Sequence, residues 1–357
     1  MFGSAIHDEK LEVAKRGMRV SASARLIGLD WGTSSLRAYL FGEAGQRLAQ
    51  RSASSGVMHL ERFRQPRQPP MSRGELFEAA LQEVCEAWFR EAPGLPILAC
   101  GMVGSTVGWR EAAYLRAPAG TDALAGALTQ VPRPGRSTLQ IVPGISAPGT
   151  PGKTLPEIMR GEETQIAGIL STGDLPDRAT DGDLLIGLPG THSKWVQVRT
   201  GKIVSFSTFV TGELFALLTS YSVIAKTKET LEGFAEEDFQ AGMEIACAPS
   251  AEGAGGVLST LFSTRAKRVL GGLREEHQRD YLSGLLIGEE LSGVERILRR
   301  DARNLRQFSR IVLAGEPGLC ARYKLACEHF QWPVVETVEG AAEQGLWNVA
   351  RTAKLVE

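Results

Sequence analysis

The sequence has few cysteines, no long hydrophobic run and almost no net charge. Its five cysteines form no CxxC pair, so we expect neither a disulfide framework nor a structural metal site. The longest apolar runs have the length of a strand, well short of the roughly 20 residues that cross a bilayer, and the first residues lack the apolar segment of a secretory signal. We therefore expect a cytoplasmic protein with no membrane partner.

A surplus of basic residues is missing as well. The chain has 40 Lys and Arg against 41 Asp and Glu, and the basic residues are scattered among the acids. A nucleic-acid-binding protein normally shows a basic excess or a concentrated basic face, so no nucleic-acid partner is expected. At 357 residues the chain exceeds what one hydrophobic core usually serves, which predicts two domains.

Polar and mixed-charge segments mark the expected domain limits. The N-terminal segment lacks a clear period and predicts a loose tail, with Met18 as an alternative start. A polar stretch at 171–182 predicts the main boundary. The expected parts are a tail (1–24), a first lobe (25–181), a second lobe (182–337) and a C-terminal helix (338–357) that packs back at the lobe junction.

Short apolar runs separated by glycine turns predict two similar halves. Strands at 26–29, 36–41 and 47–52 form an opening antiparallel meander, and an amphipathic helix follows at 75–89. A second meander is predicted from three further strands. The strands of this meander are at 184–188, 194–198 and 202–206. Further strands are expected at 96–100, 139–142 and 311–314, and further helices at 157–170, 212–221, 236–246, 281–299 and 340–352. The pattern favours a duplicated α/β core.

The segment DWGTSSLR, residues 30–37, lies at the first turn of the opening meander. Gly32 lets the backbone approach a ligand, and the N–H groups around Thr33 and Ser34 can converge on phosphate oxygens. Asp30 ends a buried strand, where a carboxylate can hold Mg²⁺. The alternative is an ordinary hairpin turn, because these residue types are common in turns.

In two later segments, a predicted strand is again followed by a glycine. LPGTHSKW, residues 188–195, places Gly190 and Thr191 in a turn, with His192 and Lys194 beside them as further phosphate contacts. The alternative is a structural histidine and a solvated lysine. At 311–319 a strand ends at Gly315 and Glu316 and opens a helix, a position where the ribose or base of a nucleotide can lie.

Paired acids stand between the two turns. Phosphorylation of a sugar needs a carboxylate that accepts the hydroxyl proton, and Glu162 or Glu163 can do so. The alternative is that the pair only complements the dipole of a helix N-terminus. A glycine-rich loop, 101–109, carries Ser105 and Trp109 and suits a polar ligand, or else it is a structural turn with the tryptophan in the core.

Residues 147–154, APGTPGKT, match a loosened P-loop pattern. The two prolines remove backbone N–H groups from a loop whose function is to present them to phosphate. We therefore interpret the stretch as a surface loop.

The ordered segments DWGTSSLR, MRGEETQ, LPGTHSKWV and VLAGEPGLCARY resemble those of the sugar-kinase/actin/Hsp70 superfamily. Together with GMVGS, IVPGIS and TGELFALL they resemble the 2-dehydro-3-deoxygalactonokinase family over most of the chain from residue 26 to 347. The resemblance implies a two-lobed actin/hexokinase-like, ribonuclease H-like α/β kinase fold with an ATP cleft between the lobes. It also implies that ATP and Mg²⁺ are used to phosphorylate 2-dehydro-3-deoxy-D-galactonate to its 6-phosphate in galactonate catabolism.

The resemblance also implies roles for residues of this chain. Asp30 would serve the metal, residues 32–34 and 190–192 the phosphates, and 315–316 the adenosine. Glu162 lies where related sugar kinases have the catalytic base, although Glu163 beside it leaves that assignment open. A cation is needed for the substrate carboxylate, and Arg160 is the first candidate, ahead of Arg37.

Two other functions remain open on the sequence alone. One is a kinase of another sugar or sugar acid, such as 2-dehydro-3-deoxygluconate, with the same ATP machinery. The other is a nucleotide-dependent sensor on the same fold that has lost turnover. The expected partners in the kinase interpretation are the sugar acid and ATP, with a homodimer as one compatible assembly.

Overall fold

The computed structural model describes residues 23–63, 70–150, 154–171, 182–226, 233–247 and 256–357. These residues form two compact units, one from the chain up to residue 176 together with 340–357, and one from 177–339. The tail expected at the N-terminus and most of the expected boundary stretch lie outside the described residues.

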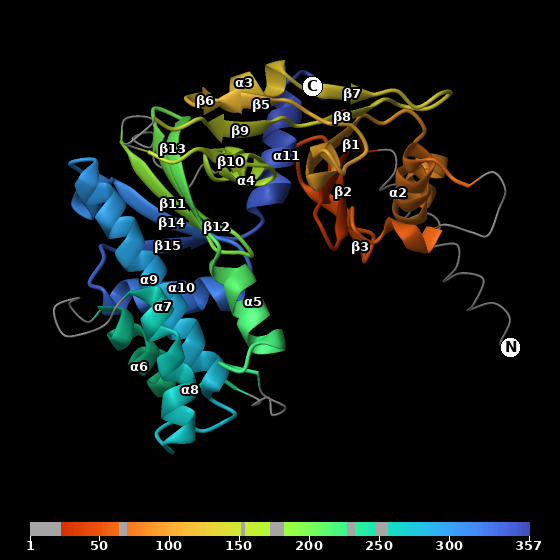
Figure 1. The fold of residues 1–357 in the computed structure, drawn as a ribbon. Coiled ribbons are helices and arrows are strands. Elements are labelled where there is room, and N and C mark those ends of the chain that lie inside the picture. The colour runs from red at the N-terminus through yellow and green to blue at the C-terminus, as the bar shows by residue number, and fades with distance from the viewer. Residues whose placement is uncertain (1–22, 64–69, 151–153, 172–181, 227–232, 248–255) are drawn as a thin grey trace, which may run out of the picture. The chain divides into compact units, whose positions relative to one another are not determined.

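The first unit is built on a sheet with strand order β3-β2-β1-β4-β8-β7 (Figure 1). Strands β1, β2 and β3 are antiparallel neighbours, β4 and β8 run parallel to β1, and β7 is antiparallel to β8. The predicted opening meander is thus confirmed. The strands are β1 (Ala24–Trp31), β2 (Leu36–Gly42), β3 (Arg47–Ala53), β4 (Ile97–Gly101), β7 (Thr129–Val131) and β8 (Leu139–Ile141).

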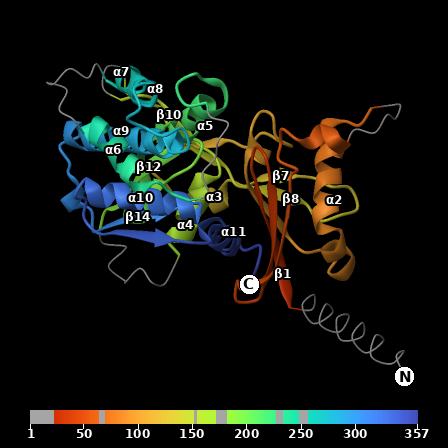
Figure 2. The same ribbon diagram turned by 90° about the horizontal axis from the view of Figure 1, so that it is seen from below.

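Helices cover both faces of this sheet. Helix α2 (Arg73–Glu91) packs its apolar side against β1, β2 and β4 in one buried core. On the other face, Gly28 of β1 leaves room for α11 (Ala341–Thr352), because a β-carbon there would lie 3.2 Å from Cδ1 of Leu346. Figure 2 shows α2 and α11 on opposite sides of β1. The other helices are η1 (Leu60–Phe63), η2 (Met102–Gly104), α3 (Thr121–Gly126) and α4 (Glu162–Ile169), the last packed on α11.

A second, smaller sheet of the first unit has the order β10-β9-β5. Its strands are β5 (Tyr114–Arg116), β9 (Gly144–Ala147) and β10 (Glu157–Met159), and the two-residue strand β6 (Ala119–Gly120) also belongs to this unit. The predicted helix at 157–170 is wrong in its first turn, because residues 157–159 pair with β9 instead. Gly161, at φ +106°, then separates this strand from α4.

The surface-loop interpretation of residues 147–154 agrees with this sheet. Strands β9 and β10 pair antiparallel, so the stretch between them connects two strands of one hairpin. A P-loop instead leads from a strand into a helix. Lys153, the residue on which the P-loop alternative depends, lies outside the described residues.

The second unit repeats the strand plan of the first. Its sheet has the order β15-β14-β11-β12-β13, in which β11, β12 and β13 form an antiparallel meander and β14 and β15 run parallel to β11. The first unit has the same directions in β8-β4-β1-β2-β3, which confirms the predicted duplication. The strands are β11 (Leu184–Leu188), β12 (Ser193–Arg199), β13 (Lys202–Phe209), β14 (Arg310–Ala314) and β15 (Val335–Val338).

Most of the second unit outside this sheet is helical. The long helix α9 contributes to two buried cores, one against the sheet and one against α5. It begins at Gln278, slightly before the predicted start. The helices are α5 (Thr211–Tyr221), α6 (Glu236–Cys247), α7 (Val257–Thr260), α8 (Phe262–Val269), α9 (Gln278–Arg300), η5 (Leu305–Gln307) and α10 (Pro317–His329).

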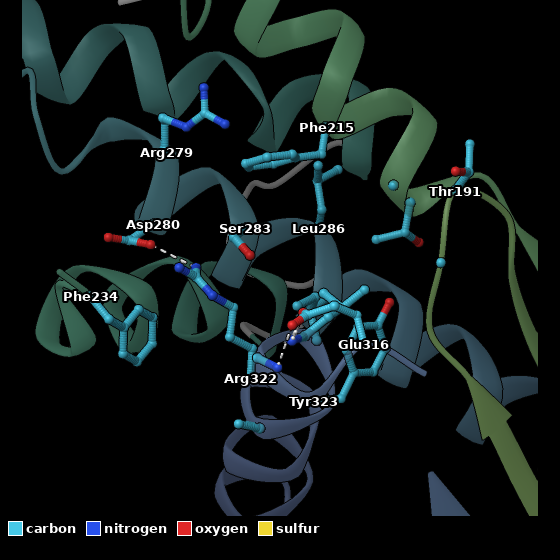
Figure 3. A pocket seen from close by; sticks show the side chains of 17 residues that line it. Thr191, Phe215, Phe234, Arg279, Asp280, Ser283, Leu286, Glu316, Arg322 and Tyr323 are labelled. Carbon is cyan, nitrogen blue, oxygen red and sulfur yellow. Dashed lines mark hydrogen bonds and ion pairs between the residues drawn. The ribbon is translucent and has the colours of Figure 1, made fainter. Parts of the chain in front are cut away.

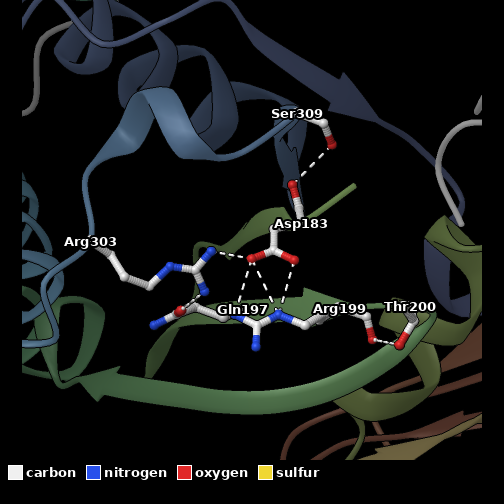
Figure 4. Close-up of polar contacts among 6 residues, drawn as sticks. All are labelled: Asp183, Gln197, Arg199, Thr200, Arg303 and Ser309. Carbon is white, nitrogen blue, oxygen red and sulfur yellow. Dashed lines mark hydrogen bonds and ion pairs between the residues drawn. The ribbon is translucent and has the colours of Figure 1, made fainter. Parts of the chain in front are cut away.

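Asp183, the residue before β11, forms hydrogen bonds with neighbouring segments of the second unit (Figure 4). Its carboxylate accepts hydrogen bonds from Arg199 at 3.1 Å and from Arg303, and its carbonyl accepts the N–H of Ser309 at 2.8 Å. The hydrogen bonds and charges of the two arginines lower the pKa of the Asp183 carboxyl. This arrangement joins β12 and the segment before β14 to the central strand.

Two expected absences can be checked within the described ranges. No helix there is both long and apolar enough to cross a membrane. Four of the cysteines are buried thiols without a disulfide, namely Cys85, Cys100, Cys320 and Cys327.

Candidate functional site

The backbone of the turn between β1 and β2 is fixed by hydrogen bonds, and its side chains are exposed to solvent. The carbonyls of Gly32 and Thr33 accept the N–H groups of Val57 and Met58, both at 3.1 Å. The side chains of Thr33 and Ser34 are exposed. The turn therefore has a fixed backbone and presents hydroxyl groups outward.

Asp30 stands at the end of β1, beside this turn. Its side chain is 22% exposed, and Arg37 across the hairpin approaches Oδ2 at 3.5 Å. Desolvation raises the pKa of the Asp30 carboxyl, and the charge of Arg37 opposes that effect only in part. Arg37, a candidate for the substrate carboxylate, is thus placed next to a carboxylate of the protein.

The carboxyl end of β1 also adjoins the start of α4. Asp30 pairs with Cys100 on parallel strand β4, and Gly101 follows it. A β-carbon on Gly161 would lie 3.2 Å from the Cα of Gly101. Desolvation raises the pKa of the buried Cys100 thiol, and the charges of Asp30, Glu163 and Glu162 raise it further.

The two acids of α4 differ in their surroundings. Glu163 has no exposed surface, and its oxygens accept the N–H of Gly161 at 2.7 Å and the hydroxyl of Thr164 at 3.1 Å. Burial, with the charge of Glu162 as a second cause, raises the pKa of Glu163 to about 7. Glu162 is only partly buried, and its Oε2 accepts the N–H of Arg160 at 3.1 Å.

Arg160 is a buried cation with unused hydrogen-bond donors. Its exposed fraction is 9%, its Nη2 donates to the carbonyl of Ala112 at 2.7 Å, and its guanidinium lies 4.3 Å from the ring centre of Tyr114. Its Nε and Nη1 are buried without a hydrogen-bond partner. Buried donors without acceptors are costly, so this geometry suits an anion that would accept a hydrogen bond from one of them.

In the glycine-rich loop after β4, one part borders Arg160 and another part packs in the core. A β-carbon on Gly104 would lie 2.9 Å from Nη1 of Arg160, so this glycine borders the free donors. Ser105 donates its hydroxyl to the carbonyl of Met102 at 2.8 Å. Trp109 stacks on Phe77 with ring centres 5.6 Å apart, the packing that the sequence left as an alternative to ligand contact.

In the second unit, the Gly190–Thr191 turn is held by the start of α5. A β-carbon on Gly212 would lie 2.3 Å from the carbonyl oxygen of Gly190, so only glycine fits there. The N–H of Glu213 donates to the carbonyl of Thr191 at 2.9 Å. The Glu213 carboxylate lies 2.6 Å from Nε2 of His192, so this histidine is tied to the same helix.

Lys194 is buried within the sheet and is not the solvated strand residue of the alternative interpretation. Its exposed fraction is 5%, and its Nζ donates to the hydroxyl of Thr208 on β13 at 2.8 Å.

The junction of β14 and α10 lies beside the second turn. A β-carbon on Gly315 would lie 3.0 Å from the carbonyl oxygen of Pro189. Glu316 caps α10, because its carboxylate accepts the N–H groups of Gly318 at 2.9 Å and Leu319 at 2.7 Å. These hydrogen bonds lower the pKa of the Glu316 carboxyl.

A pocket of about 820 Å³ in the second unit joins these two segments (Figure 3). Gly190 and Thr191 border it together with Glu316. Helices α5, α9 and α10 and Phe234, just before α6, supply the remaining wall, and the helices contribute Phe215, Arg279, Asp280, Ser283, Arg322 and Tyr323. Its volume and its mixture of apolar and polar groups are typical of a small-molecule site.

Comparison with known proteins decides the family. A sequence model of the family described as 2-keto-3-deoxy-galactonokinase matches residues 30–349. The chain belongs to this family. It is 34% identical over 304 residues to the 2-dehydro-3-deoxygalactonokinase of Escherichia coli K12, covering 85% of this chain and 89% of that one. It is 32% identical over 301 residues to a probable 2-dehydro-3-deoxygalactonokinase of Rhizobium meliloti 1021, covering 84% and 88%.

A solved structure supports the fold of this kinase. The crystal structure of a putative 2-dehydro-3-deoxygalactonokinase from Sinorhizobium meliloti superposes with a TM-score of 0.71 at 31% identity, covering 91% of this chain and 98% of that one. The predicted α/β kinase fold and the family resemblance are thereby confirmed.

Sequence reasoning missed most of the pocket wall in this kinase. Phe215, Arg279 and Ser283 lie on helices whose amphipathic pattern looks ordinary, so no local signal distinguishes them. Glu290 was missed as well, although it is an acid in an apolar stretch of α9 and has 2% exposure. An acid inside an apolar helical stretch is the one signal that the sequence offered.

Proposed function

We propose that the chain catalyses ATP-dependent phosphorylation of 2-dehydro-3-deoxy-D-galactonate to its 6-phosphate, a step of galactonate catabolism. The names of the relatives support the substrate, because the matches extend over nearly nine-tenths of their length. The observation that carries the proposal is Arg160, a buried cation whose Nε and Nη1 have no hydrogen-bond partner and whose backbone N–H donates to Glu162. An anion site beside a carboxylate is what a sugar acid with a reacting hydroxyl requires.

Arg160 is the proposed ligand of the substrate carboxylate. A guanidinium forms charge-assisted hydrogen bonds with a carboxylate, and Nε and Nη1 are the two groups of Arg160 left without an acceptor. Gly104 adds no side chain beside them, and Ser105 is the next residue of the same loop. Trp109 and Arg37 are weaker candidates, since the first packs on Phe77 and the second on Asp30.

Glu162 is the proposed catalytic base. A base must lie within hydrogen-bonding reach of the hydroxyl it deprotonates, and Glu163 has no exposed surface from which to reach it. A pKa of about 7 would suit a base, but both Glu163 oxygens are engaged at the start of α4. Glu163 is therefore assigned the positioning of Gly161 and the Glu162 backbone.

Asp30 fits a magnesium ion that arrives with the nucleotide. Its carboxylate is largely buried, and its ion pair with Arg37 is long, at 3.5 Å. No cluster of three or more potential ligands occurs in the part of the chain that the structure describes. This agrees with Mg²⁺, which proteins often hold through one or two carboxylates plus phosphate and water. The ion would neutralise phosphate charge during transfer.

The nucleotide is proposed to bind the two glycine turns and the second-unit pocket. Backbone and hydroxyl groups at 32–34 and 190–191 would bind phosphate, with the side chains of His192 and Lys194 as further contacts. The pocket beside Gly315 and Glu316 would hold the adenosine. Because Glu316 caps α10, its contribution is to fix the wall of the pocket.

The test is ADP release with Mg²⁺ and ATP across a panel of acceptors. The panel contains 2-dehydro-3-deoxygalactonate, 2-dehydro-3-deoxygluconate, galactonate, gluconate, glycerol and a control without acceptor. Turnover that is strongest on the first acid and abolished by Glu162→Gln supports the proposal. Turnover that is strongest on another acid reassigns the substrate, and tight ATP binding without any turnover favours the nucleotide-dependent sensor.

We also propose that the enzyme works in the cytoplasm, where its ATP is available, and that it forms a homodimer. Light scattering of the purified protein at several concentrations tests the dimer, which a mass of one chain throughout would exclude.

A further inference from the structure

A buried acid of α9, Glu290, stands directly behind the pocket. Its exposed fraction is 2%. Its Oε1 accepts the indole N–H of Trp195 at 2.7 Å, and its Oε2 accepts the hydroxyl of Tyr323 at 2.7 Å and also the hydroxyl of Thr211. Ser193 lies 3.0 Å from the Tyr323 oxygen and extends the network. One carboxylate therefore connects α9 with β12, α5 and α10.

Two of these partners belong to the pocket itself. Thr211 and Tyr323 both line it, and Thr211 is the first residue of α5. The next two residues of α5 hold the second glycine turn, since Gly212 abuts Gly190 and Glu213 donates to Thr191. Fixing Thr211 thus fixes the backbone that presents Gly190 and Thr191.

The network also reaches the far side of that turn. Ser193 and Trp195 begin β12, immediately after the turn. The turn is consequently held at both ends by groups that are bonded to Glu290 or to its partner Tyr323. Charge-assisted hydrogen bonds of this kind are stronger than neutral ones, and a fully satisfied buried network makes its surroundings rigid.

We infer that Glu290 is a positioning residue for the nucleotide, which sets the geometry of the second glycine turn and of the pocket wall without touching the ligand. The inference rests on the proposed binding of the nucleotide at this turn and pocket. It assigns a role in ATP affinity to an acid that neither the motifs nor the family resemblance singled out. Binding of the sugar acid, assigned to Arg160 in the first unit, should be independent of it.

The test compares Glu290→Ala with Glu290→Gln and Glu295→Ala. Removing the carboxylate leaves three donors without their acceptor, so we expect the KM for ATP to rise on the order of tenfold. The KM for the sugar acid should stay unchanged. Glutamine should keep the KM for ATP near that of the wild type, because its oxygen can accept from Trp195 while the two hydroxyls can also accept from its amide.

Glu295 is the matched control. It lies on the same helix and accepts an indole N–H as well, from Trp332 at 2.9 Å, but it borders a different pocket. Glu295→Ala should lower the melting temperature without changing the KM for ATP. A variant that merely unfolds in part would lose maximal rate and keep both KM values, since the surviving molecules are normal.

The outcomes separate this inference from the function on which it rests. An unchanged KM for ATP in Glu290→Ala, with a raised KM in Gly212→Ala, would overturn the role of Glu290 and leave the nucleotide site standing. An unchanged KM for ATP in both variants would overturn the nucleotide site itself. Equal rises in Glu290→Ala and Glu295→Ala would also reject the inference.

Discussion

Replacing Arg160 by methionine should abolish recognition of the acid while leaving the fold intact. Methionine has similar length and no charge, so it can fill the channel beside Tyr114. The variant loses the hydrogen bond to the carbonyl of Ala112 and the contact with the Tyr114 ring, each worth about 1 kcal/mol. It also removes two buried donors without partners, each of which costs about 1–3 kcal/mol in the unliganded protein.

The lost contacts amount to about 2 kcal/mol and the relieved cost to about 2–6 kcal/mol, so the melting temperature of the unliganded variant should equal or exceed that of the wild type. Activity should behave very differently. Loss of the charged hydrogen-bond donor for the substrate carboxylate corresponds to about 3 kcal/mol, or a KM for the sugar acid raised roughly 100-fold. The KM for ATP should not change, because the proposed nucleotide site involves other residues.

The assay is steady-state ADP release with 2-dehydro-3-deoxygalactonate and with its uncharged amide. The wild type should strongly prefer the acid, and Arg160→Met should lose that preference. Arg116→Met, at an exposed position of the same small sheet, is the control and should keep it. The reasoning is refuted if Arg160→Met keeps the KM for the acid, or if the unliganded variant melts far below the wild type.

Three further outcomes are expected. Gly212→Ala should raise the KM for ATP at least about tenfold in the same assay, because its β-carbon would lie 2.3 Å from the carbonyl oxygen of Gly190. Glu163→Gln should stabilise the protein by about 2 kcal/mol at pH 8 and by much less at pH 5, as measured by urea unfolding. The pKa of Glu163 is higher in the folded protein than in the unfolded chain, so its ionisation destabilises the folded protein between pH 4.5 and about 7. Asp183→Asn should cost about 1–2 kcal/mol at pH 7, a difference that disappears as pH falls below 4, because the lowered pKa of Asp183 makes its contribution depend on ionisation.

The sequence predicted the sheets well because their signals are local. Apolar runs joined by Gly32, Gly45 and Gly201 specify hairpins without reference to the rest of the chain. The strand at 157–159 was missed for the opposite reason. Its partner is β9, which no local pattern reveals, while Pro156 and the following acids favour the start of a helix.

The site was predictable only in part, for a similar reason. Motifs identified the turns, the acid pair and Arg160 as candidates, because backbone geometry and charge are visible in a short segment. Burial is not visible there. That Glu163 is enclosed while Glu162 is not, and that Arg160 retains free donors, follows from packing between β4, β5 and α4.

Because the strand plan is duplicated, the two glycine turns occupy equivalent positions, but they carry different side chains. Aligning Gly32-Thr33 with Gly190-Thr191 puts Asp30 opposite Leu188. The first turn thus has a carboxylate at the strand end where the second has a hydrocarbon. A single carboxylate is enough to hold a magnesium ion that also binds phosphate and water.

Basic side chains occur at both turns, Arg37 at the first and His192 and Lys194 at the second. The same alignment puts Lys194 opposite Leu36, and His192 opposite Ser34. An anionic ligand that carries a divalent ion needs a metal ligand at one end and positive or neutral donors at the other. The proposed assignment therefore places the metal on the first turn, where Asp30 ends the strand, and not on the second, where Leu188 ends it.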